Sequence, residues 1–332
     1  MRGVPLRRSW RPWLQSTQIV VTIALCILLL RQMAWADPLP LVAQLRWDFV
    51  ALSISVVLII HLLNVARWQY ILQQRTVGYG RLLAIYGAGL FSNNFLPTGI
   101  GGDGLRIALL SRQVPLSLAT LSVALDRGIG LVALSALFGI GIWYGMPPEI
   151  AARVHNVLGA VEQRGLLLWL LVSLMASVVL AYLCWRYIPR LWDGVSCLAA
   201  RFRPRELEKY WTQGHLRTIL IGGYAYSAVA HLLLVVTYWL VFKSLNVDLS
   251  ASAAIWLTLS ASISLLAPIT INGLGLQESV FVIILGYYGV GMTQALGGAL
   301  LVRLFMLFYS LIGALLFLPW PRTHLSKRRY GL

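Results

Sequence analysis

The chain is dominated by long runs of apolar side chains that alternate with short basic segments. Apart from the first, which is shorter, each run has about the 20 residues, or a little fewer, that an α-helix needs to cross a ~30 Å hydrocarbon core. The runs are Ile19–Leu30, Phe49–Asn64, Leu118–Tyr144, Leu166–Tyr187, Thr218–Phe242 and Gly298–Leu318. Backbone polar groups in lipid must be satisfied within the spanning element, which favours helices. We therefore predict an all-α, polytopic protein that forms a single integral membrane domain over residues 1–332.

Composition supports this prediction. Apolar residues make up 59% of the 332 residues and charged residues only 11%, whereas soluble domains are about 25% charged. Such a chain cannot cover itself with a charged surface, so a soluble enzyme, a disordered tail and a free nucleic-acid-binding protein are excluded. The net charge of +16 is then best interpreted as a determinant of topology and of contact with anionic lipid. The cysteines and histidines have no metal-ligand spacing, and we predict no metal or cofactor.

The first apolar run allows two interpretations. Four arginines precede Ile19–Leu30, and the sequence at 34–36 resembles a signal-peptidase site, so the segment is either a cleaved signal peptide or an anchor. Arg31 interrupts the approach to that site, and many apolar segments follow. We favour an uncleaved helix.

Two further apolar regions are interrupted. One stops at Pro97 and resumes after a glycine-rich turn, and the other does the same at Pro268. Proline ends a helix because it lacks an N–H and clashes with the preceding turn, and Asp103 and Asn272 suit the N-caps of the second pieces. We predict that each region is a re-entrant hairpin of two half-helices, because irregular backbone at membrane depth must be buried in protein or line a wet cavity.

The two interrupted regions belong to an internal repeat. The matched pairs are Pro97 with Pro268, Gly102 with Gly273, Gly104 with Gly275, and Arg127 with Arg303. Each predicted unit is helix–hairpin–helix, over 49–146 and 218–319. Chance similarity between two Gly/Pro turns is the alternative explanation.

Charge orients the two units. The positive-inside rule places both termini, residues 67–81 and the basic loop at 186–217 in the cytoplasm. The first hairpin then enters from the cytoplasm and the second from outside, so the repeats are inverted, a pattern typical of transporters. The loop at 186–217 is interpreted as a solvated cytoplasmic loop, with docking of a partner as the alternative.

Charges within apolar segments need a reason, because each costs about 2.5–3.5 kcal/mol at bilayer depth on insertion scales. The candidates are Asp103, Arg106, Asp126, Arg127, Glu278 and Arg303. In a structural interpretation, acids and arginines neutralise one another and fix the hairpins between the long helices. In a functional interpretation, arginines bind an anion, since their planar fork fits phosphate, and helix N-termini add N–H donors.

Asn93 and Asn94 lie just before the first turn. For these amides a helix cap or a bond between helices is favoured over substrate contact.

Taken together, these residues resemble the lysylphosphatidylglycerol synthase transmembrane region family. The motifs that carry the resemblance are Asn94-Phe-Leu-Pro97, Gly101-Gly-Asp103 with Arg106, Asp126-Arg127, and Asn272-Gly-Leu-Gly275 leading to Glu278. The resemblance spans roughly Ile19 to Leu318. It implies functional roles for Pro97, Gly101, Gly102, Asp103, Arg106, Arg127, Gly273, Gly275 and Glu278.

In the best-understood relatives this region resembles a flippase that moves aminoacylated phosphatidylglycerol between leaflets. Other relatives are stand-alone proteins linked to envelope lipids, hopanoids or polyprenyl-linked sugars. Two departures matter: nothing after Leu318 could form the soluble aminoacyl-transfer domain of the synthase, and Asn272 stands where many relatives have glycine.

The leading functional prediction is a flippase-like translocase, not an enzyme, that moves an anionic phosphate-containing or polyprenyl-phosphate-linked lipid across the inner membrane. Without an ATP motif, transport would be downhill or ion-coupled, with Glu278 or Asp103 as a proton carrier. The alternatives are an intramembrane enzyme that uses Asp103, Asp126 and Glu278 as acids or bases on lipid head groups, and a scaffold for an envelope-lipid glycosyltransferase or synthase. None of these three hypotheses includes a nucleic-acid partner.

Overall fold

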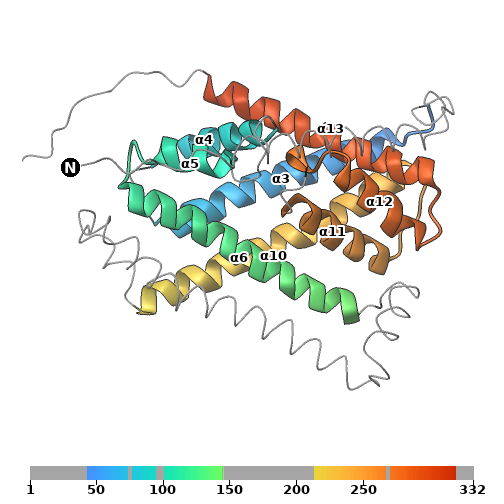
Figure 1. The fold of residues 1–332 in the computed structure, drawn as a ribbon, viewed down its shortest axis with the longest axis horizontal. Coiled ribbons are helices and arrows are strands. Elements are labelled where there is room, and N and C mark those ends of the chain that lie inside the picture. The colour runs from blue at the N-terminus through green and yellow to red at the C-terminus, as the bar shows by residue number, and fades with distance from the viewer. Residues whose placement is uncertain are drawn as a thin grey trace, which may run out of the picture.

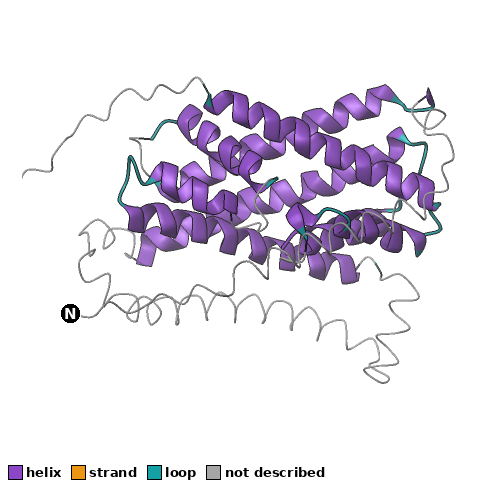
Figure 2. Ribbon diagram, turned by 45° about the horizontal axis from the view of Figure 1, so that its top comes forward, coloured by secondary structure: helices purple, strands orange, loops and turns teal. Residues whose placement is uncertain are grey.

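The computed structural model describes residues 43–73, 77–94, 101–143, 145, 213–266 and 270–318. All regular structure in these ranges is helical (Figure 2). The predicted segments Ile19–Leu30 and Leu166–Tyr187, the prolines Pro97 and Pro268, and most of the basic loop lie outside the described residues. The all-α class is confirmed for the described part of the chain.

Four helices are long and apolar enough to cross a membrane. They are α3 (Trp47–Leu72), α6 (Leu116–Trp143), α10 (Gln213–Ser244) and α13 (Met292–Phe317). The shortest have 26 residues, or ~39 Å at 1.5 Å per residue, which exceeds a ~30 Å core. Each coincides with one of the predicted apolar runs to within a few residues at the ends, so the chain is a membrane protein with several spanning helices.

Shorter helices lie between the long ones. They are α4 (Tyr79–Asn93), α5 (Gly101–Leu110), α11 (Ala251–Leu266), the single 3-10 turn η1 (Ile271–Gly273) and α12 (Leu276–Gly286). At 1.5 Å per residue, α5 and α12 are too short to cross the hydrocarbon core alone. The breaks in the sequence are therefore breaks between helices.

The long helices form the frame on which the short ones are placed (Figure 1). Helices α3 and α10 make the most extensive contact. Helix α4 packs on α5 and on α13, while α11 packs on α12 and also contacts α6. In Figure 1 the α4–α5 pair and the α11–α12 pair lie on opposite sides of the α3–α10 crossing, with their broken ends toward the middle.

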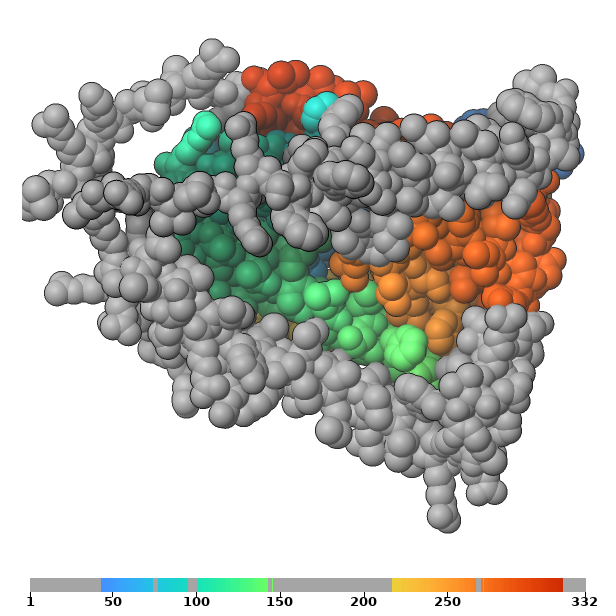
Figure 3. All heavy atoms as spheres, viewed as in Figure 1, coloured from blue at the N-terminus to red at the C-terminus, as the bar shows by residue number. Residues whose placement is uncertain are grey.

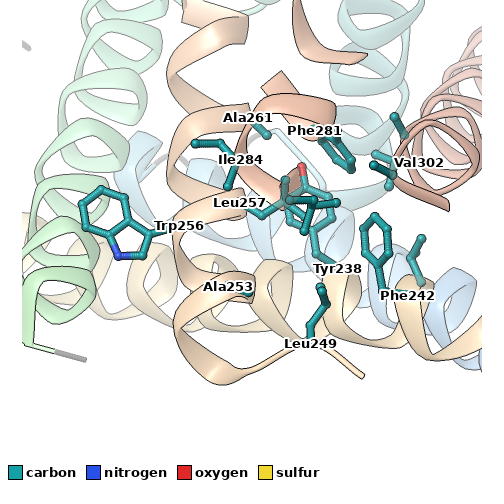
Figure 4. Close-up of a cluster of buried hydrophobic side chains, with 14 of the residues drawn as sticks. Tyr238, Phe242, Leu249, Ala253, Trp256, Leu257, Ala261, Phe281, Ile284 and Val302 are labelled. Atoms are coloured by element: carbon teal, nitrogen blue, oxygen red, sulfur yellow. The ribbon is translucent and has the colours of Figure 1, made fainter. Parts of the chain in front are cut away.

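Two hydrophobic cores support the two halves. Figure 4 shows one, where Tyr238 and Phe242 of α10 meet Phe281 of α12; the Tyr238 and Phe281 rings pack edge to face with centroids 5.4 Å apart. The other surrounds Trp68 of α3 and includes Leu110 of α5, both fully buried. Each short pair is thus anchored to a long helix by its own apolar contacts.

Helix α4 approaches α13 at a pair of glycines. A Cβ atom placed on either Gly87 or Gly313 would lie 2.5 Å from the Cα atom of the other. Real Cβ atoms do not approach a backbone that closely. The absence of side chains at these two positions therefore sets the distance between the two helices.

Three local predictions are wrong. Helix α5 already begins at Gly101, so Asp103 lies in its first turn and is not the N-cap. Asn272 lies in the 3-10 turn, and Gly275 with φ 78° is the N-cap of α12. Arg67, assigned to a cytoplasmic loop, is buried within α3 because that helix continues to Leu72.

Candidate functional site

Five charged residues form a continuous network in the first half. The Asp126 carboxylate on α6 accepts a hydrogen bond from Arg67 Nε of α3 at 2.8 Å and one from Arg106 Nη2 of α5 at 3.1 Å. Asp103 accepts from Arg127 Nε at 2.7 Å and Nη2 at 3.0 Å, and from Arg106 Nη1 at 3.3 Å. We call these residues, Arg67, Asp103, Arg106, Asp126 and Arg127, the first cluster.

Packing holds the centre of the first cluster. The Arg106 guanidinium lies 4.1 Å from the centroid of the Trp68 ring, a geometry that attracts a cation to the ring face. The indole of Trp68 donates to the Ser122 hydroxyl at 3.2 Å. Arg67 also donates to Ser227 of α10 at 2.8 Å. The cluster therefore joins α3, α5, α6 and α10.

The first cluster is unequal in charge and in exposure. It contains three arginines and two aspartates, which leaves a formal charge of +1. The Asp126 and Arg106 side chains are 4% and 5% exposed, whereas the Arg127 side chain is 48% exposed. In the described part of the chain Arg127 Nη1 forms no hydrogen bond, since only Nε and Nη2 contact Asp103. The accessible cation of this network is thus Arg127.

The second half has a smaller, neutral counterpart. Glu278 of α12 accepts from Arg303 Nε of α13 at 2.8 Å and also accepts the Gly275 N–H at 2.8 Å. Arg303 further donates to the carbonyls of Asn272 at 2.9 Å and Gly273 at 3.2 Å. We call Glu278 and Arg303 the second cluster. It is buried, and it fixes the irregular backbone before α12.

The acid–arginine pairs occupy equivalent places in the two halves. Asp103 and Glu278 are each the third residue of their short helix. Arg127 and Arg303 are each the twelfth residue of the long helix that follows. Arg127 and Arg303 therefore share a position relative to the starts of their helices.

The end of helix α4 contacts the turn before α12. Asn272 Nδ2 donates to Asn94 Oδ1 at 2.6 Å, and Asn94 Nδ2 donates to Ser310 Oγ of α13 at 2.5 Å. The neighbouring Asn93 Oδ1 accepts the Gly102 N–H at 2.7 Å. Asn93 therefore bonds to the first turn of α5, and Asn94 bonds to α13 and to the turn before α12.

Comparison with known proteins adds one observation. The family described as "Lysylphosphatidylglycerol synthase TM region" matches residues 15–313, which is most of the chain. The chain belongs to this family. No curated protein and no solved structure matches it. Membership in the lysylphosphatidylglycerol synthase transmembrane region family indicates a membrane role connected with lipids.

The residues predicted from the family motifs lie around the two breaks. Asp103, Arg106, Asp126 and Arg127 meet in the first cluster, and Glu278 meets Arg303 in the second. The remaining described members are Asn94, Gly101, Gly102, Asn272, Gly273 and Gly275, all at the helix ends beside the breaks. Pro97 lies outside the described residues. Among the described residues, no group of three or more histidine, cysteine or carboxylate side chains could hold a metal ion.

Gly102 has a steric reason to be glycine. A Cβ atom there would collide with the Gly89 carbonyl and with the Asn93 side chain. This close approach lets α5 lie against α4 and brings the Gly102 N–H to Asn93. At this position the family motif is explained by packing.

Three polar residues of the site were missed in the sequence. Arg67 was assigned to a loop. It lies only three residues beyond the apolar run that ends at Asn64, so a helix slightly longer than that run includes it. Ser227 and Ser310 lie in apolar runs, where a single serine carries no signal until its partner is known. Their contacts join residues 160 and 216 positions apart.

Proposed function

We propose that the protein is a flippase-like lipid translocase that moves an anionic, phosphate-containing lipid across the inner membrane. The observation that carries the proposal is the excess cation of the first cluster, accessible at Arg127. Charges at membrane depth favour partners of opposite sign, so a network with one excess positive charge favours an anion beside it. Arginine offers phosphate two parallel hydrogen bonds, and Arg127 keeps Nη1 for such a ligand.

The proposal includes two inverted helix–hairpin–helix units, with α4–α5 and α11–α12 as re-entrant hairpins. The contacts between helices support it, since they repeat when one half is exchanged for the other. The contacts of α5 with α4 and α6 correspond to those of α12 with α11 and α13. In the same way, the contact of α4 with α13 corresponds to that of α11 with α6. The short lengths of α5 and α12 also favour helices that enter and return rather than cross.

Topology follows from the same proposal. Both termini and the basic loop at 186–217 are placed in the cytoplasm by the positive-inside rule. The first break then opens from the cytoplasmic side and the second from the outer side. Because the breaks meet at Asn94 and Asn272, a head group leaving one would be next to the other.

The carboxylates bear on the alternative of an intramembrane enzyme. Asp103, Asp126 and Glu278 are each occupied by at least one arginine. For acid–base work a guanidinium would first have to leave. Binding of a phosphate to Arg127 does not need a free carboxylate. If the phosphate replaced Asp103 at Arg127, Asp103 would keep its hydrogen bond to Arg106.

The test is leaflet exchange in reconstituted vesicles. Fluorescent phosphatidylglycerol is followed by bleaching with a membrane-impermeant reductant, in vesicles with and without the protein. We expect protein-dependent exchange, and a fall of about tenfold or more in Arg127→Ala, since a charge-assisted hydrogen bond contributes about 1.5–3 kcal/mol. Asp103 retains Arg106 in that variant, so no carboxylate loses all its partners.

The matched control is Arg112→Ala, which removes an exposed arginine in the turn after α5. Equal exchange rates for Arg127→Ala and Arg112→Ala would remove Arg127 from the site, and absence of exchange in wild type would refute the translocase. Mass analysis of the same lipids distinguishes the enzyme, which would change their covalent structure.

A further inference from the structure

Asn272 has an unusual backbone for its residue type. Its φ of 47° and ψ of 35° place it in the left-handed region, which glycine adopts more easily than any residue with a Cβ atom. The following Gly273 and Gly275 also have positive φ. A third glycine would serve the turn at least as well, so the backbone alone does not account for the asparagine.

The side chain of Asn272 supplies what glycine could not. Its amide reaches Asn94 at the end of α4, 2.6 Å away and 178 residues earlier in the chain. Asn94 in turn is held by Ser310 of α13. The Asn272 carbonyl accepts from Arg303, so one residue joins the second cluster to the first break.

We propose that the Asn94–Asn272 hydrogen bond is a latch between the two breaks, and that Asn272 is a positioning residue for lipid transport. While the bond is intact, the break before α12 lies against the end of α4 and no head group passes between them. When the bond opens, the turn before α12 separates from the end of α4 and admits the head group. This inference rests on the proposed function.

The variant that tests the latch is Asn272→Gly. Glycine tolerates the same backbone angles, so the change removes the amide without strain at the turn. We expect exchange of labelled phosphatidylglycerol to rise about threefold to tenfold, the range that corresponds to one neutral hydrogen bond, with a parallel rise for zwitterionic phosphatidylcholine.

The chain offers a closely matched control in Asn246. It also has positive φ, 58°, and its Nδ2 also donates to an oxygen, the Gln44 carbonyl at 3.1 Å. Asn246→Gly therefore makes the same chemical change away from the breaks, and it should leave the exchange rate unchanged. An Asn272→Gly rate equal to or below those of wild type and Asn246→Gly would overturn the latch.

A second readout does not depend on lipid movement. Thr270 is 3% exposed beside the break. Its hydroxyl has no hydrogen-bond partner among the residues that the structure describes, so Thr270→Cys removes no described bond. With Cys26, Cys184 and Cys197 replaced by serine, a water-soluble maleimide should label Cys at position 270 at least threefold faster when Asn272→Gly is added. Equal labelling would overturn the latch. If wild type moves no lipid, the proposed function fails, and this labelling still decides whether the bond closes the break.

Discussion

Removing the Asp126 carboxylate should destabilise the protein strongly. In Asp126→Asn, Arg67 and Arg106 both lose their shared anion, and their side chains are only 11% and 5% exposed. The formal charge of the first cluster rises from +1 to +2. Because removal of one partner leaves a buried charge uncompensated, the expected loss is about 3–5 kcal/mol.

The same substitution at an exposed ion pair is the control. Asp48 contacts Arg46 at 3.1 Å with side chains 63% and 49% exposed, and exposed pairs contribute about 1 kcal/mol or less. Thermal unfolding of both variants in the same detergent measures the difference. We expect Asp126→Asn to lower Tm by roughly 10 °C and Asp48→Asn by a few degrees at most. Equal Tm values would refute the claim that Asp126 neutralises two buried arginines.

Two further substitutions test the packing and the second cluster. Gly313→Ala places a methyl group against the Gly87 backbone, so it should lower the free energy of unfolding by about 1–3 kcal/mol. Gly128→Ala is the control, because the space around its Cβ position is open, and it should leave stability unchanged. Equal Tm values for the two variants would contradict the close contact between α4 and α13. Glu278→Gln leaves the Arg303 cation without its carboxylate, and we expect about 3 kcal/mol or more of lost stability, measured by thermal unfolding; a Tm unchanged from wild type would contradict the ion pair.

The long helices could be predicted because their signal is local. Apolar runs of spanning length predicted all four described spans, and only their ends were misplaced. The end of α3 shows why: the run loses its apolar character at Asn64, but the helix continues to Leu72 because Arg67 is satisfied inside the protein by Asp126 and Ser227. Hydropathy cannot identify a buried charge whose partners lie on other helices.

The site was only partly predictable for the same reason. Its charged residues other than Arg67 were found because charges are rare in these segments, but their pairing was not. Matching the glycines of the two turns places Asp103 opposite Leu274, whereas helix position places it opposite Glu278. The connection before α12 includes the turn whose carbonyls bind Arg303. An alignment of the two regions by their glycines therefore differs from an alignment by their helix starts.

The two clusters differ in charge, and this difference determines the order of steps along the proposed path. The first cluster carries +1 and presents Arg127 with one nitrogen available. The second is neutral, and its arginine is saturated by Glu278 and two carbonyls. An anion is therefore attracted to the first cluster, and the second cluster offers no competing cation of equal accessibility, since the Arg303 side chain is 9% exposed. The lipid head group can then leave past Asn272 without binding strongly to a second arginine. The rate of leaflet exchange should therefore be limited by opening of the Asn94–Asn272 contact.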